Sequence, residues 1–399
     1  MTYLSGKTVV LGVSGGIAAY KAIDVCRRLM DAGATVLPVM TDGAQRFVGA
    51  TTFSALASEP VRTEIFEAAD PIPHTRLGQR ADLIVVCPAT ARVIGAFAAG
   101  ISSDLLTATL LATRAPVLVC PAMHTEMWEH PAVQENLETL ARRGVGIVPP
   151  ESGRLAGGDA GVGRLAAPEV IVAAIERALG PGDLAGWKVL ISAGGTREPI
   201  DPVRVITNRS TGKQGYALAE AALARGAEVT LVTTAELPPP PGATVVPVET
   251  AAQMQAAIMP IAEAQDAIVM AAAVADFTPA APADRKIKKD PDASVAPTLD
   301  LAPTHDFLVD LGARKPLGQV LVGFAAETDD LRANAAAKLA RKRLDLIVGN
   351  DVSAPGTGFA HDTNAVVILA ADGNEPLVPL ATKRVVAEAV WDAMVARRA

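Results

Sequence analysis

Glycines and polar side chains crowd one turn near the middle of the 399-residue chain. Residues 194–215 read GGTREPIDPVRVITNRSTGKQG and lie between an apolar strand-like run, 189–191, and a helix-like run, 216–223. A glycine-rich turn between a strand and a helix exposes backbone N–H groups at the positive end of the helix, where a phosphate can bind. The turn carries more hydroxyl, amide and basic side chains than its geometry needs. The pattern therefore indicates a nucleotide-type site.

A second strand–glycine–helix unit opens the chain at residues 9–17, VVLGVSGGI. Alone, its glycines fit a tight packing turn equally well. Two further strand-like runs end in small and hydroxyl residues, at Thr41 and at 87–91, CPATA. The carboxyl ends of such strands converge on the crevice where open parallel sheets bind ligands. We therefore expect a second nucleotide-type site in the first half.

Short apolar runs that alternate with helical stretches predict parallel sheets covered by helices. The fold class we expect is α/β, with two doubly wound Rossmann-like domains over residues 1–180 and 186–399, separated at Gly-Pro-Gly-Asp, 180–183. The weakly periodic stretch 277–304 predicts a functional loop. The strands that we predict are 8–13, 35–40, 82–87, 116–120, 188–192, 228–233, 266–272, 319–323, 345–348 and 365–369. The helices are 17–32, 90–99, 132–142, 168–179, 213–225, 250–264 and 383–397.

Composition narrows the class of protein. A net charge of −7 argues against a nucleic-acid binder, whose phosphate contacts need a basic face. Three cysteines, Cys26, Cys87 and Cys120, indicate a reducing compartment without a disulfide framework. The apolar run 105–123 is interrupted by Arg114 and two prolines, so it is too short for a membrane span. With no signal peptide visible, we expect a cytoplasmic enzyme that binds neither membrane nor nucleic acid.

Six stretches give the first half a specific resemblance: GVSGGIAAYK (12–21), VMT (39–41), CPATA (87–91), AAGISSDLL (98–106), PAMHTEMW (121–128) and SGRLAGGDAGVGR (152–164). This half resembles the FMN-dependent, homo-oligomeric cysteine decarboxylases, in particular those acting on phosphopantothenoylcysteine. The resemblance implies that FMN contacts Ser14, Gly15, Thr41, Thr90, Ala91 and Met123. It also implies that His74 is the essential histidine and acts on FMN held by a neighbouring subunit. Without the resemblance, a loop histidine after Pro73 would be the simpler interpretation of His74.

The chemistry of that family oxidises the substrate thiol with FMN. The resulting thioaldehyde lies β to the carboxylate and makes loss of CO₂ easy. The flavin then reduces the enethiolate product, so the cofactor supplies the redox step and the protein supplies position and protons. A histidine such as His74 suits proton transfer near neutral pH.

Two positions depart from the family pattern. His124 stands where an asparagine usually holds the substrate carboxylate, and a histidine can donate a hydrogen bond in its place with added pH sensitivity. Gly157 stands where the family has a proton-donating cysteine. Another group, or water, must protonate the enethiolate if this half is active.

The second half resembles the CTP-using phosphopantothenate–cysteine ligases of bacteria. Besides 192–215, the matching stretches are AAAVADF (271–277), KIKK (286–289), VGFAAET (322–328), KLARK (338–342) and GND (349–351). Together the halves resemble the fused decarboxylase/ligase of coenzyme A biosynthesis. The resemblance implies CTP, cysteine and 4′-phosphopantothenate as substrates, Mg²⁺ beside FMN as cofactors, and a homo-oligomer of ligase dimers and decarboxylase trimers, up to a dodecamer. The metal ligands are not identified by the sequence.

The implied reaction begins when the 4′-phosphopantothenate carboxylate attacks the α-phosphorus of CTP. The amine of cysteine then displaces CMP from the acyl-cytidylate. Asn208 would hold that intermediate and Lys286 would stabilise the triphosphate, whose charge requires cations and backbone donors. The residues implied around CTP are Ala271, Ala272, Asp276, Lys286, Asp306, Phe324, Lys338 and Lys342. In the segment 304–308, Thr304 and His305 replace a usual Asn-Pro, which affects local contacts with the nucleotide rather than the reaction.

Other interpretations are open at this stage. The lysines of 286–289 fit a solvated patch, and Lys338 and Lys342 fit an exposed helix face. The departures at His124 and Gly157 allow a chain whose ligase is active while its first half serves regulation or oligomerisation. A nicotinamide oxidoreductase is disfavoured because neither glycine turn reads G-x-G-x-x-G.

Overall fold

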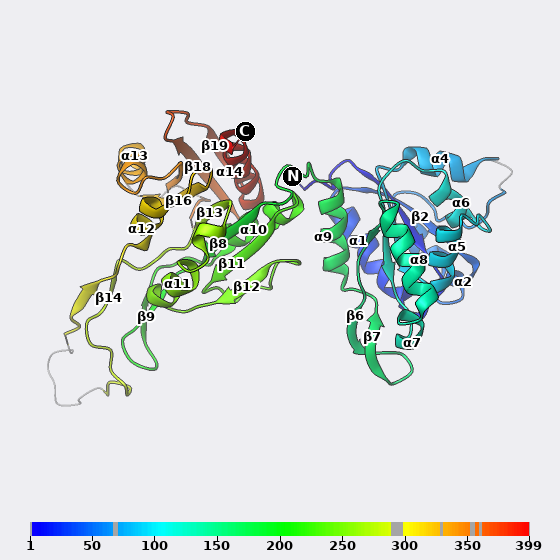
Figure 1. Ribbon diagram of the computed structural model, residues 1–399, viewed down its shortest axis with the longest axis horizontal. Coiled ribbons are helices and arrows are strands. Elements are labelled where there is room, and N and C mark those ends of the chain that lie inside the picture. The colour runs from blue at the N-terminus through cyan, green and yellow to red at the C-terminus, as the bar shows by residue number, and fades with distance from the viewer. Residues whose placement is uncertain are drawn as a thin grey trace. The chain divides into compact units, whose positions relative to one another are not determined.

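The computed structural model describes residues 2–66, 71–288, 298–327, 330–351, 356–358 and 361–398 (Figure 1). The chain divides after Gly180 into two compact units, called here the first and second unit. Lys289 and Thr328, which end two of the motifs quoted above, lie outside the described residues. Among the residues described, no helix is both long and apolar enough to cross a membrane.

The first unit contains a five-stranded sheet in the order β2-β1-β3-β4-β5. All its neighbouring strands pair in parallel. The chain order reverses between β1 and β3, and ligands bind at such switch points in open α/β sheets. The strands are β1 (Thr8–Val13), β2 (Thr35–Met40), β3 (Leu83–Ala89), β4 (Val117–Pro121) and β5 (Gly146–Ile147).

Helices cover both faces of this sheet because its strands are apolar on both sides. Along β1, Val9 and Leu11 belong to one buried cluster and Val10 to another. Two strands outside the sheet, β6 (Glu151–Arg154) and β7 (Ala160–Arg164), form an antiparallel ribbon that we call the flap. The helical elements are η1 (Ile17–Lys21), α1 (Ala22–Asp31), α2 (Asp42–Gln45), α3 (Ala50–Leu56), α4 (Pro73–Arg80), α5 (Ala91–Ala99), α6 (Leu105–Leu111), α7 (Thr125–Trp128), α8 (Pro131–Arg142) and α9 (Pro168–Leu179).

The second unit contains an eight-stranded sheet in the order β12-β11-β8-β13-β16-β17-β18-β19. The six strands up to β17 are parallel and reverse order between β8 and β13, as in a dinucleotide-binding fold. The strands are β8 (Lys188–Ala193), β11 (Glu228–Thr233), β12 (Thr244–Pro247), β13 (Ala267–Met270), β16 (Val320–Glu327), β17 (Leu346–Asp351), β18 (Thr363–Ala370) and β19 (Leu377–Thr382).

The prediction of a parallel sheet is wrong at one edge, because β18 and β19 run antiparallel to their neighbours. Only residues 371–376 join these two strands, and so short a connection cannot return the chain for a parallel pairing. The expected loop 277–304 is also partly regular, since β14 (Phe277–Pro279) pairs with β15 (Leu301–Pro303). A further ribbon pairs β9 (Arg197–Pro199) with β10 (Val205–Thr207).

The helix that follows the central glycine turn, α10, is buried along most of its length. Its small and apolar residues pack between the sheet and α14, in the largest buried cluster of this unit. The predicted helix 213–225 is thus the packing centre of the unit. The helical elements are α10 (Lys213–Ala224), α11 (Ala251–Ile258), η2 (Ala262–Ala264), α12 (Phe307–Arg314), α13 (Leu331–Arg341) and α14 (Lys383–Arg398).

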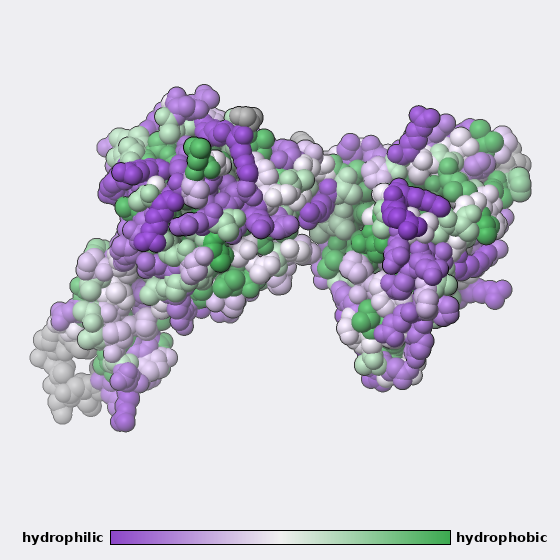
Figure 2. Space-filling view, viewed as in Figure 1, coloured by the Kyte–Doolittle hydropathy of each residue, from purple (hydrophilic) through white to green (hydrophobic). Residues whose placement is uncertain are grey.

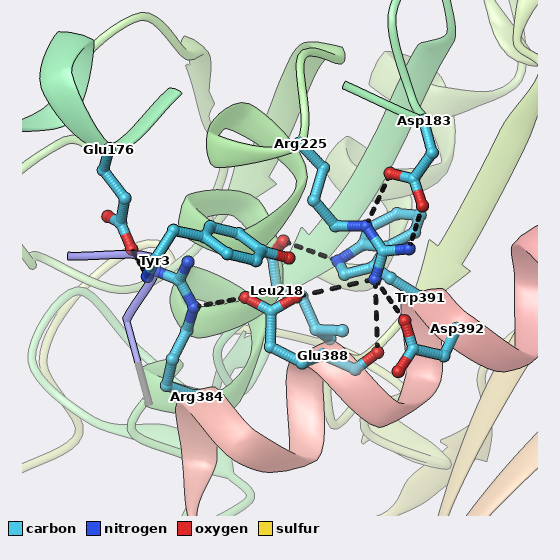
Figure 3. A network of polar contacts seen from close by, with 9 residues as sticks. All are labelled: Tyr3, Glu176, Asp183, Leu218, Arg225, Arg384, Glu388, Trp391 and Asp392. Atoms are coloured by element: carbon cyan, nitrogen blue, oxygen red, sulfur yellow. Dashed lines mark hydrogen bonds and ion pairs between the residues drawn. The ribbon is translucent and has the colours of Figure 1, made fainter. Parts of the chain in front are cut away.

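One arginine joins α10 to α14 (Figure 3). Arg225 caps the end of α10 and is only 3% exposed. Its Nε lies 2.9 Å from Oδ1 of Asp183, and its Nη1 lies 2.7 Å from Oδ1 of Asp392 and 3.5 Å from Oε2 of Glu388. Beside this group, the indole N–H of Trp391 donates to the carbonyl of Leu218 at 3.0 Å. The end of α10 is therefore fixed to α14 by a buried charge with several partners.

We predict that Arg225→Ala destabilises the second unit by roughly 3 kcal/mol, because it removes a buried guanidinium and leaves the partly buried carboxylate of Asp183 without its counter-charge. Arg332→Ala is the matched control, since Arg332 pairs with Glu375 on the surface, where such pairs contribute at most about 1 kcal/mol. Urea unfolding of the full chain, followed by tryptophan fluorescence, measures both. If the two substitutions lower the free energy of unfolding equally, the buried contacts of Arg225 contribute no more than a surface ion pair.

Candidate active sites

A pocket of about 760 Å³ opens beside the first switch point, at the carboxyl ends of β1 and β3. Gly15 and Gly16 come from the turn after β1, Thr41 follows β2, and Thr90 and Ala91 follow β3. Met123 and His124, which follow β4, and residues of the flap complete its lining. The structure thus brings together residues that the sequence analysis selected from four separate segments. The flap residues are a part of the lining that strand-end reasoning alone would not have found.

Ser14 is the exception among the predicted binding residues, because it does not line this pocket. It is 1% exposed, and its hydroxyl donates to the carbonyl of Pro88 at 2.7 Å. The same oxygen accepts a hydrogen bond from the backbone N–H of Thr90 at 3.0 Å. Ser14 therefore ties the turn after β1 to the turn after β3 and positions Thr90 in the pocket wall.

The glycine turn after β1 lies directly against the segment after β2. A Cβ atom added to Gly15 would lie 2.6 Å from the carbonyl carbon of Gly43, which is too close for any side chain. A Cβ on Gly16 would meet only the methyl group of Thr90, at 3.3 Å. Thr41 accepts a hydrogen bond from the backbone N–H of Ala44 at 3.3 Å and so caps α2. Main chain rather than side chains therefore forms this wall of the pocket.

His124 stands between two carboxylates at the edge of the pocket. Its Nδ1 contacts the carboxylate of Glu126, and its Nε2 lies 3.2 Å from Oδ2 of Asp159 in the flap turn. The hydrogen bond with Glu126 is the main cause that raises the pKa of His124, and the charges of both carboxylates add to it. A Cβ on Gly157 would lie 3.5 Å from Nε2, so the flap turn rests against this imidazole. Neither carboxylate partner was identified from the sequence.

His74 lies outside this pocket in its own chain. The alternative interpretation as a loop histidine is wrong, because Pro73 begins α4 and His74 follows within its first turn. Its Nδ1 is buried without a hydrogen-bond partner. Buried polar atoms in folded proteins normally have a hydrogen-bond partner, and a group from outside this chain could be the partner of this Nδ1.

The cysteines are part of the core rather than the pocket. All three are fully buried, as the core interpretation required. Burial raises the pKa of Cys26 to about 11. A hydrogen bond with Cys87, together with burial, raises the pKa of Cys120. None of these thiols lines the pocket, so none is placed to donate a proton there.

A narrower pocket of about 100 Å³ lies at the switch point of the second unit. The turn before α10 forms one side of it, and the residues after β13 and within β16 form the other. Gly212 takes a left-handed conformation with φ of 80° and caps α10 without a side-chain hydrogen bond. Gly212 offers no side-chain cap to the first backbone N–H groups of α10, and a helix N-terminus of this kind can bind an anion. The lining residues are Ser210–Gly215, Ala271–Ala273, Phe324–Ala326, Asn350, Gly358, Asn364 and Lys383.

Asn208 lies beside this pocket. Its amide donates to the carbonyl oxygens of Ala273 and Val274, both at 3.2 Å. A Cβ on Gly195 would lie 2.7 Å from the carbonyl oxygen of Asn208, so only glycine allows this approach. The predicted residues Ala271, Ala272 and Phe324 line the pocket itself. The structure therefore places Asn208 next to part of the predicted nucleotide contacts.

The remaining predicted residues form pairs around α13 and the loop after β14. Lys342 lies 2.8 Å from Oδ2 of Asp306, and Lys338 lies 2.6 Å from Oε1 of Glu327. The carbonyl of Asp276 accepts from the N–H of Thr304 at 2.9 Å, which joins the turn after β13 to the segment 304–308. The interpretation of the two lysines as a purely solvated face is thus incomplete, because each reaches a carboxylate.

Lys286 is exposed, but its segment is fixed at the next residue. The N–H of Ile287 donates to Asp201 at 3.1 Å, and Arg204 donates to the carbonyl of Ile287 at 3.2 Å. Asp201 is 2% exposed, and backbone hydrogen bonds from Val203, Ile287 and Arg204 lower the pKa of its carboxyl group against the opposing effect of burial. The Lys286 side chain therefore extends from an anchored backbone.

Several residues of the second pocket, among them Lys383, Gln214 and Asn350, were missed by the sequence analysis as site candidates. Lys383 begins α14, is 6% exposed, and has its pKa lowered by burial. The side-chain oxygens of Gln214 and Asn350 are buried without partners. The only sequence signal for Gln214 was its position within the 192–215 stretch, and the only one for Asn350 was its position in the GND motif. Across the described ranges, no group of three or more His, Cys, Asp or Glu residues could hold a metal ion.

Fold and pockets define a chain of two α/β units with one pocket at each switch point. The family model described as "Flavoprotein" matches residues 2–180, and the one described as "DNA/pantothenate metabolism flavoprotein C-terminal domain" matches residues 184–397. The chain belongs to the family of bifunctional coenzyme A biosynthesis proteins. This confirms the resemblance stated above, and with it the α/β fold class and the prediction of an enzyme that combines a decarboxylase with a ligase.

Curated relatives match over nearly the full length. The coenzyme A biosynthesis bifunctional protein CoaBC of Mycobacterium tuberculosis (strain ATCC 25618 / H37Rv) is 49% identical over 405 residues, covering 98% of this chain and 96% of the relative. Its counterpart in Bacillus subtilis (strain 168) is 48% identical over 387 residues, covering 95% and 94%. A crystal structure of the C-terminal domain of a CoaBC protein is 37% identical, covers 54% of this chain and 97% of that chain, and has a TM-score of 0.46.

We predict that Gly15→Ala destabilises the first unit by about 2 kcal/mol, since the added methyl group must displace the backbone at Gly43. Gly16→Ala is the matched control, because its methyl group meets only the end of the Thr90 side chain. Differential scanning calorimetry of the full chain reports both. If Gly15→Ala unfolds at as high a temperature as Gly16→Ala, the turn after β1 is not in firm contact with the segment after β2.

Proposed function

We propose that the second unit joins cysteine to 4′-phosphopantothenate with CTP, through an acyl-cytidylate. The first unit then decarboxylates the 4′-phosphopantothenoylcysteine to 4′-phosphopantetheine with FMN. The observation that carries the proposal is the pair of switch-point pockets, each lined mainly by residues of the motif stretches quoted above. Their presence in one chain allows the ligase product to become the decarboxylase substrate.

The first pocket fits a flavin nucleotide. Its volume lies within the usual range for cofactor sites. Because Gly15 and Gly43 leave no space for side chains, a phosphate can approach the main chain there. Gly15, Thr41, Thr90, Ala91 and Met123 would hold the cofactor, with Ser14 fixing Thr90 from behind. When bound, FMN supplies the redox chemistry of the decarboxylation.

The protein's own groups would supply charge and protons. His124 lies on the pocket edge, where an imidazolium attracts the carboxylate of the substrate. His74 would reach the pocket of a neighbouring subunit, which accounts for the unpartnered Nδ1 in a single chain. A homo-oligomer is therefore part of the proposal. Figure 2 shows hydrophobic residues exposed on the surface of the first unit. Among the exposed apolar side chains, Ile17, Tyr20 and Met127 line the pocket, and Ile72 directly precedes α4.

In the second unit, cations and backbone donors would bind the triphosphate of CTP. The N-terminus of α10 and the ammonium groups of Lys213 and Lys383 lie on one pocket. A Mg²⁺ ion would accompany the phosphates, as is usual for nucleotide triphosphates. Asn208 would hold the acyl phosphate beside Ala273, and Lys286 would extend over the triphosphate from its anchored segment. Asp276, Asp306, Lys338 and Lys342 would complete the nucleotide site.

The test gives the full chain CTP, cysteine and 4′-phosphopantothenate and measures the amide product and CO₂. We expect amide formation, CO₂ release and a yellow protein with one FMN per chain. His74→Asn should lower CO₂ release by ~10²-fold or more, the usual scale for general acid–base catalysis, and leave amide formation intact. The proposal fails for the first unit if the protein takes up no FMN or releases no CO₂, and amide formation alone would support the regulatory alternative.

A second pair of variants separates the two ligation steps. Lys286→Gln should slow pyrophosphate release in the absence of cysteine by ~10²–10³-fold, because the triphosphate loses a stabilising charge. Asn208→Asp should still release pyrophosphate but form little amide, because its carboxylate repels the cytidylate phosphate. That carboxylate also faces the carbonyls of Ala273 and Val274, so thermal unfolding is measured for both variants. If a folded Asn208→Asp blocks pyrophosphate release as fully as Lys286→Gln, Asn208 belongs to CTP binding instead.

A further inference from the structure

The decarboxylation proposed above, on which this inference rests, creates a demand for one proton. When CO₂ leaves the thioaldehyde, its bonding electron pair stays on the substrate as an enethiolate. Before the two-carbon unit can become saturated, the carbon that lost CO₂ must form a new C–H bond. The pocket must therefore present an acid to that carbon.

Few residues lining the pocket can meet this demand. The ionisable ones are Tyr20, Lys21, Arg92, His124, Arg154 and Arg164. Tyrosine, lysine and arginine ordinarily hold their protons up to pH values of about 10 or higher. Histidine ordinarily titrates near pH 6.5, so it can both give a proton and recover one from water. The flap turn opposite the imidazole presents Gly157 and Gly158, which carry no proton donor in a side chain, and Asp159, whose carboxylate pairs with His124.

The surroundings of His124 favour its protonated form. Glu126 on α7 contacts Nδ1, and Asp159 in the flap turn lies 3.2 Å from Nε2. The other charged groups lining this pocket are Arg154 and Arg164 on the flap, Arg92 on α5 and Lys21 at the end of η1. The two carboxylates are the nearest of these charges, and they raise the pKa of His124. Its Nε2 faces the flap turn, and a Cβ added at Gly157 would contact it at 3.5 Å.

We propose that His124 is the acid of the decarboxylase unit and that its Nε2–H protonates the carbon that has lost CO₂. The C=C electron pair forms the new C–H bond while the N–H bond of the imidazolium breaks. An electron pair on sulfur restores C=S, so no electrons enter or leave in this step. Neutral imidazole then regains a proton from water. If the imidazolium also attracts the substrate carboxylate, it is already beside the carbon that CO₂ leaves behind.

The test uses His124→Gln in the full flavin-loaded chain and compares products by mass. The wild-type chain should release CO₂ and form the saturated thiol. His124→Gln should still release CO₂, more slowly, but the fraction of the unsaturated product, two hydrogens lighter, should rise at least ~10-fold, the scale of a lost acid catalyst. Gly157→Cys added to His124→Gln should restore the saturated product, since a thiol at that position would face the same space.

A second readout does not depend on turnover. In NMR titrations of the chain without cofactor, the pKa of His124 should lie above the ordinary value of about 6.5. Glu126→Gln should lower this pKa. The imidazolium is then lost at a lower pH than in wild type, and the saturated product is lost with it. Asp310→Asn is the matched control, because it removes the carboxylate 2.6 Å from Nε2 of His305 and should leave His124 unchanged.

Two results would overturn the assignment. One is a wild-type proportion of saturated product from His124→Gln. The other is a wild-type chain that releases CO₂ but forms only the unsaturated product. Absence of CO₂ from the wild-type chain is a different result, because it would refute the proposed decarboxylation itself.

Discussion

Close approach of backbone segments after the first strand of each sheet is the constraint on which both sites depend. In the first unit, a Cβ on Gly15 would lie 2.6 Å from the backbone of Gly43. In the second, a Cβ on Gly215 would lie 2.5 Å from the Cβ of Ala193. Because Gly15 and Gly215 carry no side chains, the chain after each of these strands packs directly beside the sheet. Each switch point can then present backbone donors to a phosphate.

Polar contacts convert these two turns into sites with different chemistry. In the first unit, the hydroxyl of Ser14 fixes the backbone of Thr90, and the flap brings Asp159 to His124. That arrangement provides a wide pocket with one imidazole held by carboxylates. In the second unit, Asn208 is fixed on the turn after β13, and the lining of the small pocket there includes Lys213 and Lys383. The first site suits proton transfer, and the second suits a highly charged phosphate.

The sequence predicted the centres of both sheets because their strands are continuous apolar runs with glycine turns at the carboxyl ends. It missed the flap strands and short helices such as α2 and α7, which contain too few residues for a periodic pattern. It also missed the antiparallel edge, since β18 is as apolar as a parallel strand. Thr41 and Thr90, which follow strands and line the first pocket, could be selected from local order as pocket candidates. The contacts of His124 with Asp159 and the burial of Lys383 depend on tertiary packing, which no local spacing encodes.

The central claim is that one chain holds a flavin nucleotide at the β1/β3 switch point and a triphosphate at the β8/β13 switch point. A crystal structure of the full chain grown with FMN and CTP tests it most directly. The account predicts the flavin between the Gly15 turn, Thr90 and the flap, with the triphosphate of CTP at the N-terminus of α10. Both nucleotides in one unit, or either one at the opposite end of its sheet, would contradict it.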